Sequence, residues 1–326
     1  MRLASPWPPQ LEGKVSQMNK TLEQTLKSIL WFASALAVLV AALCWPRGNV
    51  RSQTTDVVLI GAGDIADGLG FNLSGAFATA ALLDANPAAT VFADGDHAYG
   101  HATDGDFARS YDPTWGRAKL RTIPVIGRHD YDSLNAAGYF NYFGPAAGDP
   151  TKGYYSIDLG AWHIVALNSE CSHVPGGCGV GSPQETWLRN DLASHTQACT
   201  LALFHEPLYT SSSQITPNAA VQPLWQDLYN NNADLIVNGH AHNYERFAPQ
   251  DANAHLDTAR GTVEIIAGTG GEGHFPFNAS IAPNSLVRNA DTFGVLQLTL
   301  HESSFDWQFI PVAGKTFADS GTQACH

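Results

Sequence analysis

Residues 237–246 read VNGHAHNYER, and this stretch decides how the rest of the chain is interpreted. The preceding run, ADLIV at 233–237, is mainly apolar and predicts a buried strand of a parallel sheet. Gly239 allows a sharp turn, and His240 and His242 follow it. On a loop that leaves a strand both imidazoles can reach one point, and imidazole binds zinc, iron, copper and nickel. The stretch therefore predicts a metal-binding strand end, although histidine has many other uses.

Four other predicted strands end in the same way, with a glycine or a proline beside an acidic residue or a histidine. Ligand sites in α/β sheets lie beyond the carboxyl ends of the strands, so these side chains are expected to converge into a site with nitrogen and oxygen ligands for transition metals. Taken singly each has a structural explanation, such as a helix cap for Asp64 or a core position for Tyr99. The five strand ends supply Asp64; Asp96 with Tyr99; Arg128 with His129; His205; and His240 with His242.

The order of elements predicts an α/β fold. Apolar strand patterns alternate with helical stretches, which indicates crossover units, and the two segments around Gly160 predict an antiparallel hairpin. No linker or internal repeat interrupts residues 55–326, so a single domain is expected there. The expected strands are 55–60, 90–93, 122–126, 153–159, 161–168, 199–204, 233–237, 262–267, 293–300 and 304–310, and the expected helices are 74–86, 185–194 and 222–230.

Charge and hydropathy limit the partners and the location. The 326 residues carry a net charge of −13 with only 17 Lys and Arg, which argues against binding to nucleic acid or to an anionic membrane surface. Residues 29–45 are apolar and uncharged, and we expect them to form an export signal or a single membrane anchor between an N-terminal tail (1–28) and a linker (46–54). The domain is then expected outside the cytoplasm, as a secreted, periplasmic or anchored protein that meets the membrane only through this segment.

Four cysteines beyond Cys44 agree with export. They allow three disulfide pairings. Cys171 and Cys178 flank a Pro-Gly-Gly turn and are expected to pair, which leaves Cys199 with Cys325. A four-thiolate zinc site is the alternative, but the short paired spacings of such sites are missing.

At these motifs the chain resembles the calcineurin-like metallophosphoesterases, and within them the purple acid phosphatases of bacterial type. Residues 95–99 (GDHAY), 204–209 (FHEPLY) and 239–246 (GHAHNYER) are similar to three motifs of that subgroup. The resemblance implies a four-layer α/β/β/α sandwich with mixed sheets and a dinuclear metal centre. In that centre Asp64, Asp96, Tyr99 and His242 would hold Fe³⁺, and Asp96, His205 and His240 would hold Fe²⁺, Zn²⁺ or Mn²⁺.

Two departures from the family pattern concern the second ion. Arg128 stands where the family has an asparagine ligand, and a guanidinium cannot ligate a metal. Glu206 and residues 211–214 stand where bacterial relatives often carry further histidines. We therefore expect an impaired second site, with Arg128 and His129 contacting the phosphate.

The resemblance implies an exported phosphatase that hydrolyses small phosphomonoesters. A metal-bound hydroxide would attack phosphorus, with Asp96 between the two ions and His129 protonating the leaving oxygen or orienting the phosphate. A phosphodiesterase is a close alternative, and a degenerate protein that binds a phosphate-bearing ligand without turnover is another. Four further residues are expected around the ligands: His97, Asp130, Tyr244 and His274.

Overall fold

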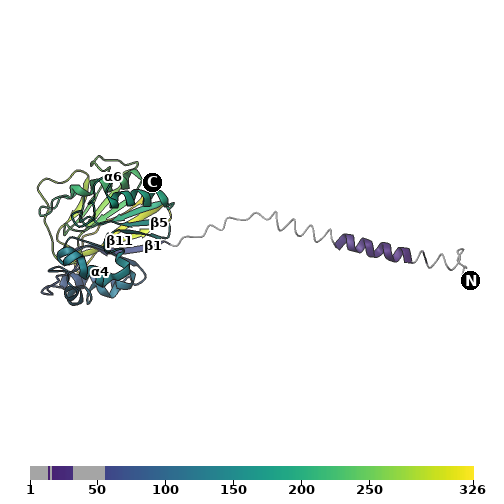
Figure 1. Cartoon of the computed structure of the whole chain (residues 1–326), viewed down its shortest axis with the longest axis horizontal. Helices are drawn as coiled ribbons and strands as arrows, with labels where there is room; N and C mark the ends of the chain where they lie inside the picture. The colour runs from purple at the N-terminus through teal and green to yellow at the C-terminus, as the bar shows by residue number, and fades with distance from the viewer. Residues whose placement is uncertain (1–13, 15–16, 32–55) are drawn as a thin grey trace, which may run out of the picture. The chain divides into compact units, whose positions relative to one another are not determined.

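The computed structural model describes Lys14 and residues 17–31 and 56–326 (Figure 1). The chain divides into two units, residues 1–53 and 54–326, and each is considered by itself. Of the expected signal or anchor at 29–45, everything from residue 32 onward lies outside the described residues. No helix within the described ranges combines the length and the apolar character needed to cross a membrane.

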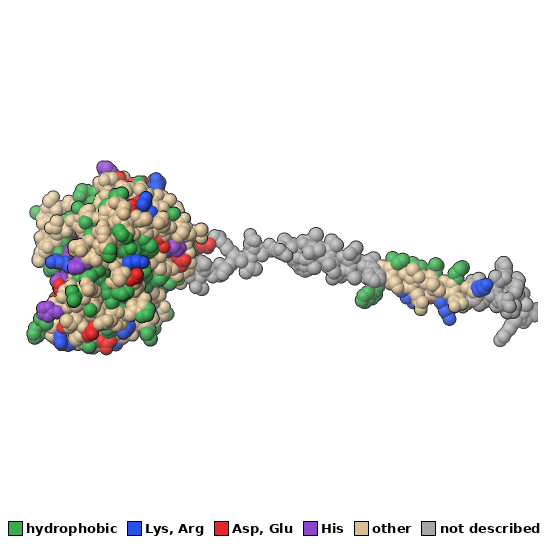
Figure 2. All heavy atoms as spheres, in the orientation of Figure 1, with side chains coloured by type: hydrophobic (Ala, Val, Ile, Leu, Met, Phe, Trp, Pro, Cys, Tyr) green, Lys and Arg blue, Asp and Glu red, His purple; other side chains and the backbone are tan. Residues whose placement is uncertain are grey.

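In the N-terminal unit, residues 17–31 are helical. Met18, Leu22, Leu26 and Ile29 recur at intervals of three or four residues, so they lie on one side of this helix, and all four are exposed (Figure 2). On the polar side, Lys27 forms an ion pair with Glu23 one turn earlier, at 3.1 Å.

The first sheet of the C-terminal unit has six strands in the order β13-β12-β11-β1-β2-β3. The strands β1, β2 and β3 are parallel to one another, and β11, β12 and β13 continue the sheet in antiparallel fashion. The bounds are β1 Val57–Ala62, β2 Thr90–Asp94, β3 Thr122–Val125, β11 Gly294–Leu300, β12 Ser304–Pro311 and β13 Ser320–Ala324.

The second sheet has seven strands in the order β10-β8-β9-β7-β6-β5-β4. Its centre, β5-β6-β7-β9, is parallel, and β4, β8 and β10 pair antiparallel at its two sides. The bounds are β4 Tyr155–Leu159, β5 Trp162–Ala166, β6 Cys199–Leu203, β7 Leu235–Asn238, β8 Tyr244–Phe247, β9 Val263–Ala267 and β10 Ser285–Asn289.

Three apolar clusters build four layers. The inner cluster packs side chains of one sheet, such as Phe92 and Leu298, against those of the other, such as Trp162 and Leu203. The outer face of the first sheet is covered by α2 (Ser74–Asp84) and α4 (Ala137–Phe143), and the outer face of the second by α5 (Pro183–Ser194) and α6 (Gln222–Asn230). Figure 1 shows α4 and α6 on opposite sides of the strands. The predicted α/β class and four-layer sandwich are confirmed.

The expected strands are present within a few residues of their predicted bounds, and α6 begins and ends where it was predicted. The prediction missed two helices, α3 (Asp104–Asp106) and α4, and three strands, β8, β10 and β13. All three missed strands pair antiparallel at or near the margins of the sheets, and Ser320–Ala324 contains no large apolar residue, so no apolar alternation marks it.

Both expected disulfides are present. Cys171 and Cys178 close a short loop with their Cα atoms 5.2 Å apart, and Cys199 joins Cys325 with a Cα separation of 5.6 Å. The second bridge ties the start of β6 to the residue that follows β13 and so connects the two sheets.

Candidate metal centre

The side chains expected at the site do lie at the carboxyl ends of parallel strands from both sheets. Because the two sheets face each other, the loops that follow their strands meet along one edge of the sandwich. Asp64 follows β1, Asp96 and Tyr99 follow β2, Arg128 and His129 follow β3, His205 follows β6, and His240 and His242 follow β7.

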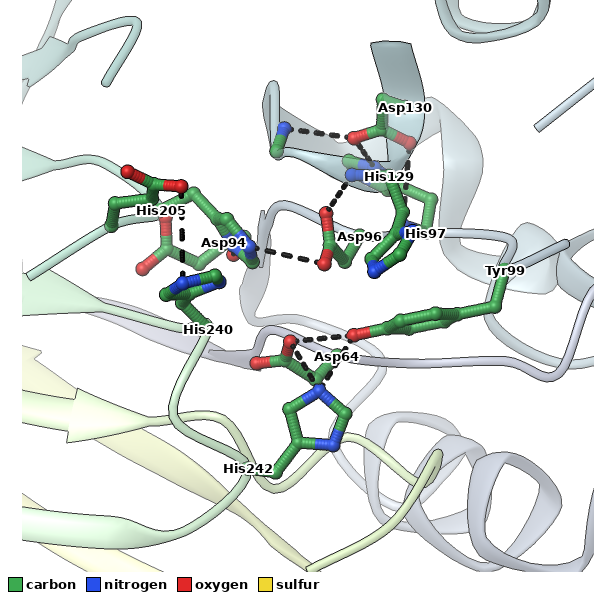
Figure 3. A network of polar contacts seen from close by, with 12 residues as sticks. Asp64, Asp94, Asp96, His97, Tyr99, His129, Asp130, His205, His240 and His242 are labelled. Carbon is green, nitrogen blue, oxygen red and sulfur yellow. Dashed lines mark hydrogen bonds and ion pairs between the residues drawn. The ribbon is translucent and has the colours of Figure 1, made fainter. Parts of the chain in front are cut away.

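One half of the site consists of Asp64, Tyr99 and His242 (Figure 3). The Tyr99 hydroxyl donates to Asp64 Oδ1 at 2.7 Å and lies 2.8 Å from His242 Nε2. Asp64 Oδ1 and His242 Nε2 are themselves 3.2 Å apart. The Phe275 ring stacks on the His242 ring at 4.0 Å between centroids and fixes its orientation. This half therefore presents a carboxylate, a phenol and an imidazole to one point.

The other half consists of Asp96, His205 and His240, whose ligating atoms all lie within 4.8 Å of one another. His205 Nε2 lies 3.1 Å from Asp96 Oδ2, and the second oxygen of Asp96 accepts the backbone N–H of His129 at 2.7 Å. The other ring nitrogen of His205, Nδ1, donates to the Asp94 carbonyl at 2.9 Å. That bond fixes the ring and leaves Nε2 facing the centre, which is how histidine ligands are usually held.

The backbone at these ligands is strained. Asp64, Asp96, His240 and His242 have φ values of 61°, 53°, 66° and 47°, a region that residues other than glycine rarely adopt. Such strain costs about 1–3 kcal/mol at each position and collects at functional sites. The backbone at Gly95 also lies close to the His205 ring, because a Cβ at this position would collide with the imidazole. The conformations of residues 95–96 (GD) and 239–242 (GHAH) therefore position the candidate ligands.

The polar atoms of this cluster fit a bound metal. Within the described part of the chain, Asp64 Oδ2 and His205 Nε2 are buried without a hydrogen bond. Buried polar atoms are normally paired, so a cation would resolve these exceptions. Carboxylate oxygens, a phenol oxygen and imidazole nitrogens are ligands that suit iron, zinc and manganese.

Burial and the neighbouring carboxylates and imidazoles shift the pKa values of the groups in this cluster. Burial would raise the pKa of Asp64 and of Asp96, but the adjacent His242 and His205 imidazoles outweigh it, so both pKa values lie below the ordinary range. Burial, together with the nearby His205 imidazole, lowers the pKa of His240 to about 4. His240 is thus neutral near pH 7, the form in which an imidazole ligates metal.

A cleft of about 440 Å³ opens onto both halves and is large enough for a small phosphorylated molecule. Arg128 and His129 lie at its wall, and the Arg128 side chain is exposed. His129 Nδ1 lies 2.7 Å from Asp132 Oδ2, an ion pair that fixes the ring. His274 also lines the cleft, as predicted, with its ring stacked on Phe293.

Three of the four residues expected around the ligands have other positions. His97 points away from the centre and pairs with Asp130 at 2.9 Å, and both side chains are fully buried (Figure 3). Aromatic rings surround His97, and Asp130 also accepts the Gly127 N–H, so this pair supports the loop after β3. Tyr244 needs a correction, because it lies in the core between the sheets and its hydroxyl donates to Asp319.

Three carboxylates near the centre were not predicted. Glu206 Oε1 lies 3.8 Å from His240 Nε2, and Glu170 is buried, with a pKa that burial and the nearby Glu206 raise to about 8. Burial also raises the pKa of Glu272, on the opposite side of the cleft, to about 7. Glu272 follows β9 and lies between two glycines, so the rule applied to the other strand ends would have found it. Glu170 follows β5 without a glycine or a proline beside it, so that rule would have missed it.

Comparison with known proteins agrees with this geometry. The model of the calcineurin-like phosphoesterase family matches residues 32–244. An acid phosphatase A of Cryphonectria parasitica is 30% identical over 52% of this chain and 38% of its own length. A probable inactive purple acid phosphatase 9 of Arabidopsis thaliana is 25% identical over 64% of this chain and 40% of its own. The chain thus spans about two fifths of the length of these relatives.

A solved structure supports the fold. The purple acid phosphatase from yellow lupin (Lupinus luteus) seeds superposes with a TM-score of 0.66 at 18% identity, over 83% of this chain and 54% of its own. At that identity the likeness concerns the fold alone.

Proposed function

The chain belongs to the calcineurin-like phosphoesterase family, and on that basis we propose that it is a metal-dependent phosphatase that hydrolyses small phosphomonoesters. The observation that carries the proposal is the convergence of Asp64, Tyr99 and His242 with Asp96, His205 and His240 under one cleft. When bound there, a pair of ions would supply an activated water and neutralise charge on the phosphate.

The residues of the chain have distinct roles in this proposal. Asp96, whose carboxylate contacts His205 in Figure 3, would contact both ions and so connect the two halves. Asp64, Tyr99 and His242 would hold one ion, and His205 and His240 the other. We propose Fe³⁺ for the half that contains the tyrosine, and Fe²⁺, Zn²⁺ or Mn²⁺ for the other.

His129 and Arg128 would handle the substrate. The ion pair with Asp132 holds the His129 ring from its Nδ1 side, so Nε2 is left to contact a phosphate oxygen or to transfer a proton to the leaving oxygen. Arg128 is exposed at the cleft, where a guanidinium can hold two phosphate oxygens at once.

The test is to measure iron, zinc and manganese in the purified full chain and to assay it with an aryl phosphate monoester and the matching diester. We expect two metal ions per chain and faster cleavage of the monoester. Faster cleavage of the diester would replace the proposal by the phosphodiesterase alternative. His129→Ala should retain both metals and lose activity by about 100-fold or more, because general acid–base groups typically contribute that much.

A second candidate is a protein that binds a phosphorylated ligand without hydrolysing it. Arg128 favours it, because the position of an expected metal ligand is occupied by an exposed phosphate-binding cation. One metal ion or none, together with retained binding of phosphate and no turnover, would decide for this candidate.

We also propose that the domain is exported, with residues 29–45 as signal or anchor. The two disulfides support an oxidising compartment, since such bridges rarely persist in the cytosol. Peptide mapping of the protein from its own host should find all four cysteines protected from alkylation before reduction. Alkylation of Cys171 or Cys199 in unreduced protein would contradict export.

A further inference from the structure

The divalent half of the centre lacks one expected ligand but has an unused carboxylate beside it. Asp96, His205 and His240 provide three protein ligands, and the side chain at position 128 is an exposed arginine that provides none. Borderline divalent ions such as Zn²⁺ usually have at least four ligands, some of them water. A further protein ligand is therefore sought among the residues next to His205 and His240.

Glu206 is placed to be that ligand. It follows His205 directly, its backbone N–H donates to Ser169 Oγ at 2.9 Å, and its Oε2 accepts a hydrogen bond from the Asn218 amide. The other oxygen, Oε1, lies 3.8 Å from His240 Nε2, and 18% of the side chain is exposed. Two atoms that bind one ion at about 2.1 Å each can be at most about 4.2 Å apart, so this separation is compatible with an ion shared by Glu206 and His240. Glu206 lies outside the group of Asp96, His205 and His240, so its side chain would have to turn toward these three ligands when the ion binds.

A second carboxylate, that of Glu170, also favours a cation next to Glu206. Glu170 is 7% exposed, and its Oε1 has no hydrogen-bond partner among the described residues. Its electrostatic neighbours include Glu206, His205 and Asp96, with Arg128 as the balancing positive charge. A buried carboxylate without a partner is costly, and the nearby carboxylate of Glu206 adds to the cost, unless a cation lies between or beside them.

We propose that Glu206 is a ligand of the divalent ion, through Oε1, and that it takes the place of the missing amide ligand. Glu170 and Arg128 then lie near the site as electrostatic neighbours without contacting the ion. This proposal rests on the proposed function, because it presupposes a metal at this position. The proposal also gives Arg128 a different role: its positive charge compensates the added carboxylate of Glu206 and does not simply displace an ion.

The test compares metal affinities of the full chain and its variants, without reference to turnover. Metal-free protein is titrated with Mn²⁺ by calorimetry and by the electron paramagnetic resonance signal of free Mn²⁺, after the first site has been filled with Fe³⁺. Glu206→Ala should weaken binding of the second ion by more than about 100-fold, because even residues that only support a ligand cost 10- to 100-fold. His205→Ala is the positive control for loss of that ion.

Two further variants separate ligation from charge. Glu170→Gln removes the ionisable carboxyl group from the same neighbourhood without removing a ligand, and it should weaken the second ion by less than about tenfold. Glu206→Gln keeps an amide oxygen at the position and should fall between Glu206→Ala and the wild type. Thermal unfolding of each metal-free variant checks that it is folded.

The outcomes are distinguishable. If the wild type binds two ions and Glu206→Ala binds both with unchanged affinity, Glu206 is not a ligand and the proposed function still stands. Equal losses in Glu170→Gln and Glu206→Ala would also overturn the assignment, because the effect would then be one of charge. If the wild type binds no second ion at millimolar Mn²⁺, both this proposal and the two-metal function fail.

Discussion

The two halves of the metal centre differ in how closely they follow the family motifs. Around Asp64, Tyr99 and His242 every expected ligand is present, and the three side chains already contact one another. Around Asp96, His205 and His240 the ligands also converge, but two neighbouring positions have changed to charged residues, Arg128 and Glu206. The first half therefore has the full expected set of candidate ligands, and the second half departs from the expected pattern at two positions.

This difference indicates that the fold determines the positions from which side chains reach the candidate centre. It determines the residue type at each of these positions less strictly. The positive φ angles of Asp64, Asp96, His240 and His242 span both halves, so the strained backbone is common to them. The two departures, Arg128 and Glu206, lie in the loops after β3 and β6, outside the apolar clusters that pack the sheets. Four substitutions test how independent the halves are.

The largest effect is expected from Asp96→Asn, because Asp96 is the one carboxylate proposed to contact both ions. Loss of its charge should weaken both ions and lower kcat/KM by more than about 100-fold, the upper end of what outer supporting residues cost. Metal analysis after dialysis, together with aryl phosphate turnover, measures both effects. Retention of two tight ions by the variant would show that Asp96 does not join the halves.

Tyr99→Phe should affect only the first half. If Tyr99 ligates Fe³⁺, the oxidised protein has a visible phenolate-to-iron band, and the variant should lose it while the second ion remains. Tyr155→Phe is a matched control, because that half-buried tyrosine donates to the Pro124 carbonyl away from the centre. A Tyr99→Phe protein that contains iron and keeps its colour would refute the assignment.

Arg128→Asn should affect only the second half, and less strongly. Removal of an exposed cation and restoration of an amide should raise the affinity for Zn²⁺ or Mn²⁺ by about tenfold, which corresponds to about 1.4 kcal/mol. Arg128→Met separates the two causes, since it removes the charge without adding a ligand. An unchanged affinity in both variants would mean that position 128 does not influence the second ion.

The smallest effect on the centre is expected from Tyr244→Phe, although Tyr244 belongs to the same motif as His240 and His242. Its hydroxyl donates to Asp319 Oδ2 at 2.7 Å, and the same carboxylate pairs with Arg246. Loss of this hydrogen bond should cost about 1–2 kcal/mol of unfolding free energy and leave metal content unchanged. Urea unfolding at neutral pH measures this loss of unfolding free energy. A loss of metal from the variant would show instead that Tyr244 supports the metal centre.

The same interaction has a defined pH dependence. Burial would raise the pKa of Asp319, but hydrogen bonds from Arg246 and Tyr244 hold it below the ordinary value of 3.8. The stability that Asp319 contributes is therefore complete above pH 3.8 and is lost as the pH falls through the lowered pKa of the folded state. The difference between wild type and Tyr244→Phe should shrink in that acidic range.

The sequence was sufficient to predict those parts of the fold and site that a local pattern specifies. Apolar strands followed by glycine and a polar residue predicted the parallel strands and the six candidate ligands, because strand ends in such sheets meet at one edge. The strands β8, β10 and β13 were missed, since pairing with a neighbouring strand, and not apolar alternation, determines them.

Other features depend on side-chain direction, which sequence spacing does not give. His97 and Tyr244 lie within motifs but point away from the cleft, whereas Glu170 and Glu206 point toward the centre from positions that were not considered as ligands. A residue two positions from a ligand on a strand faces the same side, but the turn at His242 breaks that relation for Tyr244.

The most direct test of the two-metal phosphatase is a titration of metal-free full chain, in which aryl phosphate hydrolysis is followed against equivalents of bound metal. We predict little hydrolysis with the first equivalent, held by Asp64, Tyr99, Asp96 and His242, and a rise that ends at two equivalents per chain. Full hydrolysis with one equivalent or none, or no hydrolysis with two tightly bound ions, would contradict it.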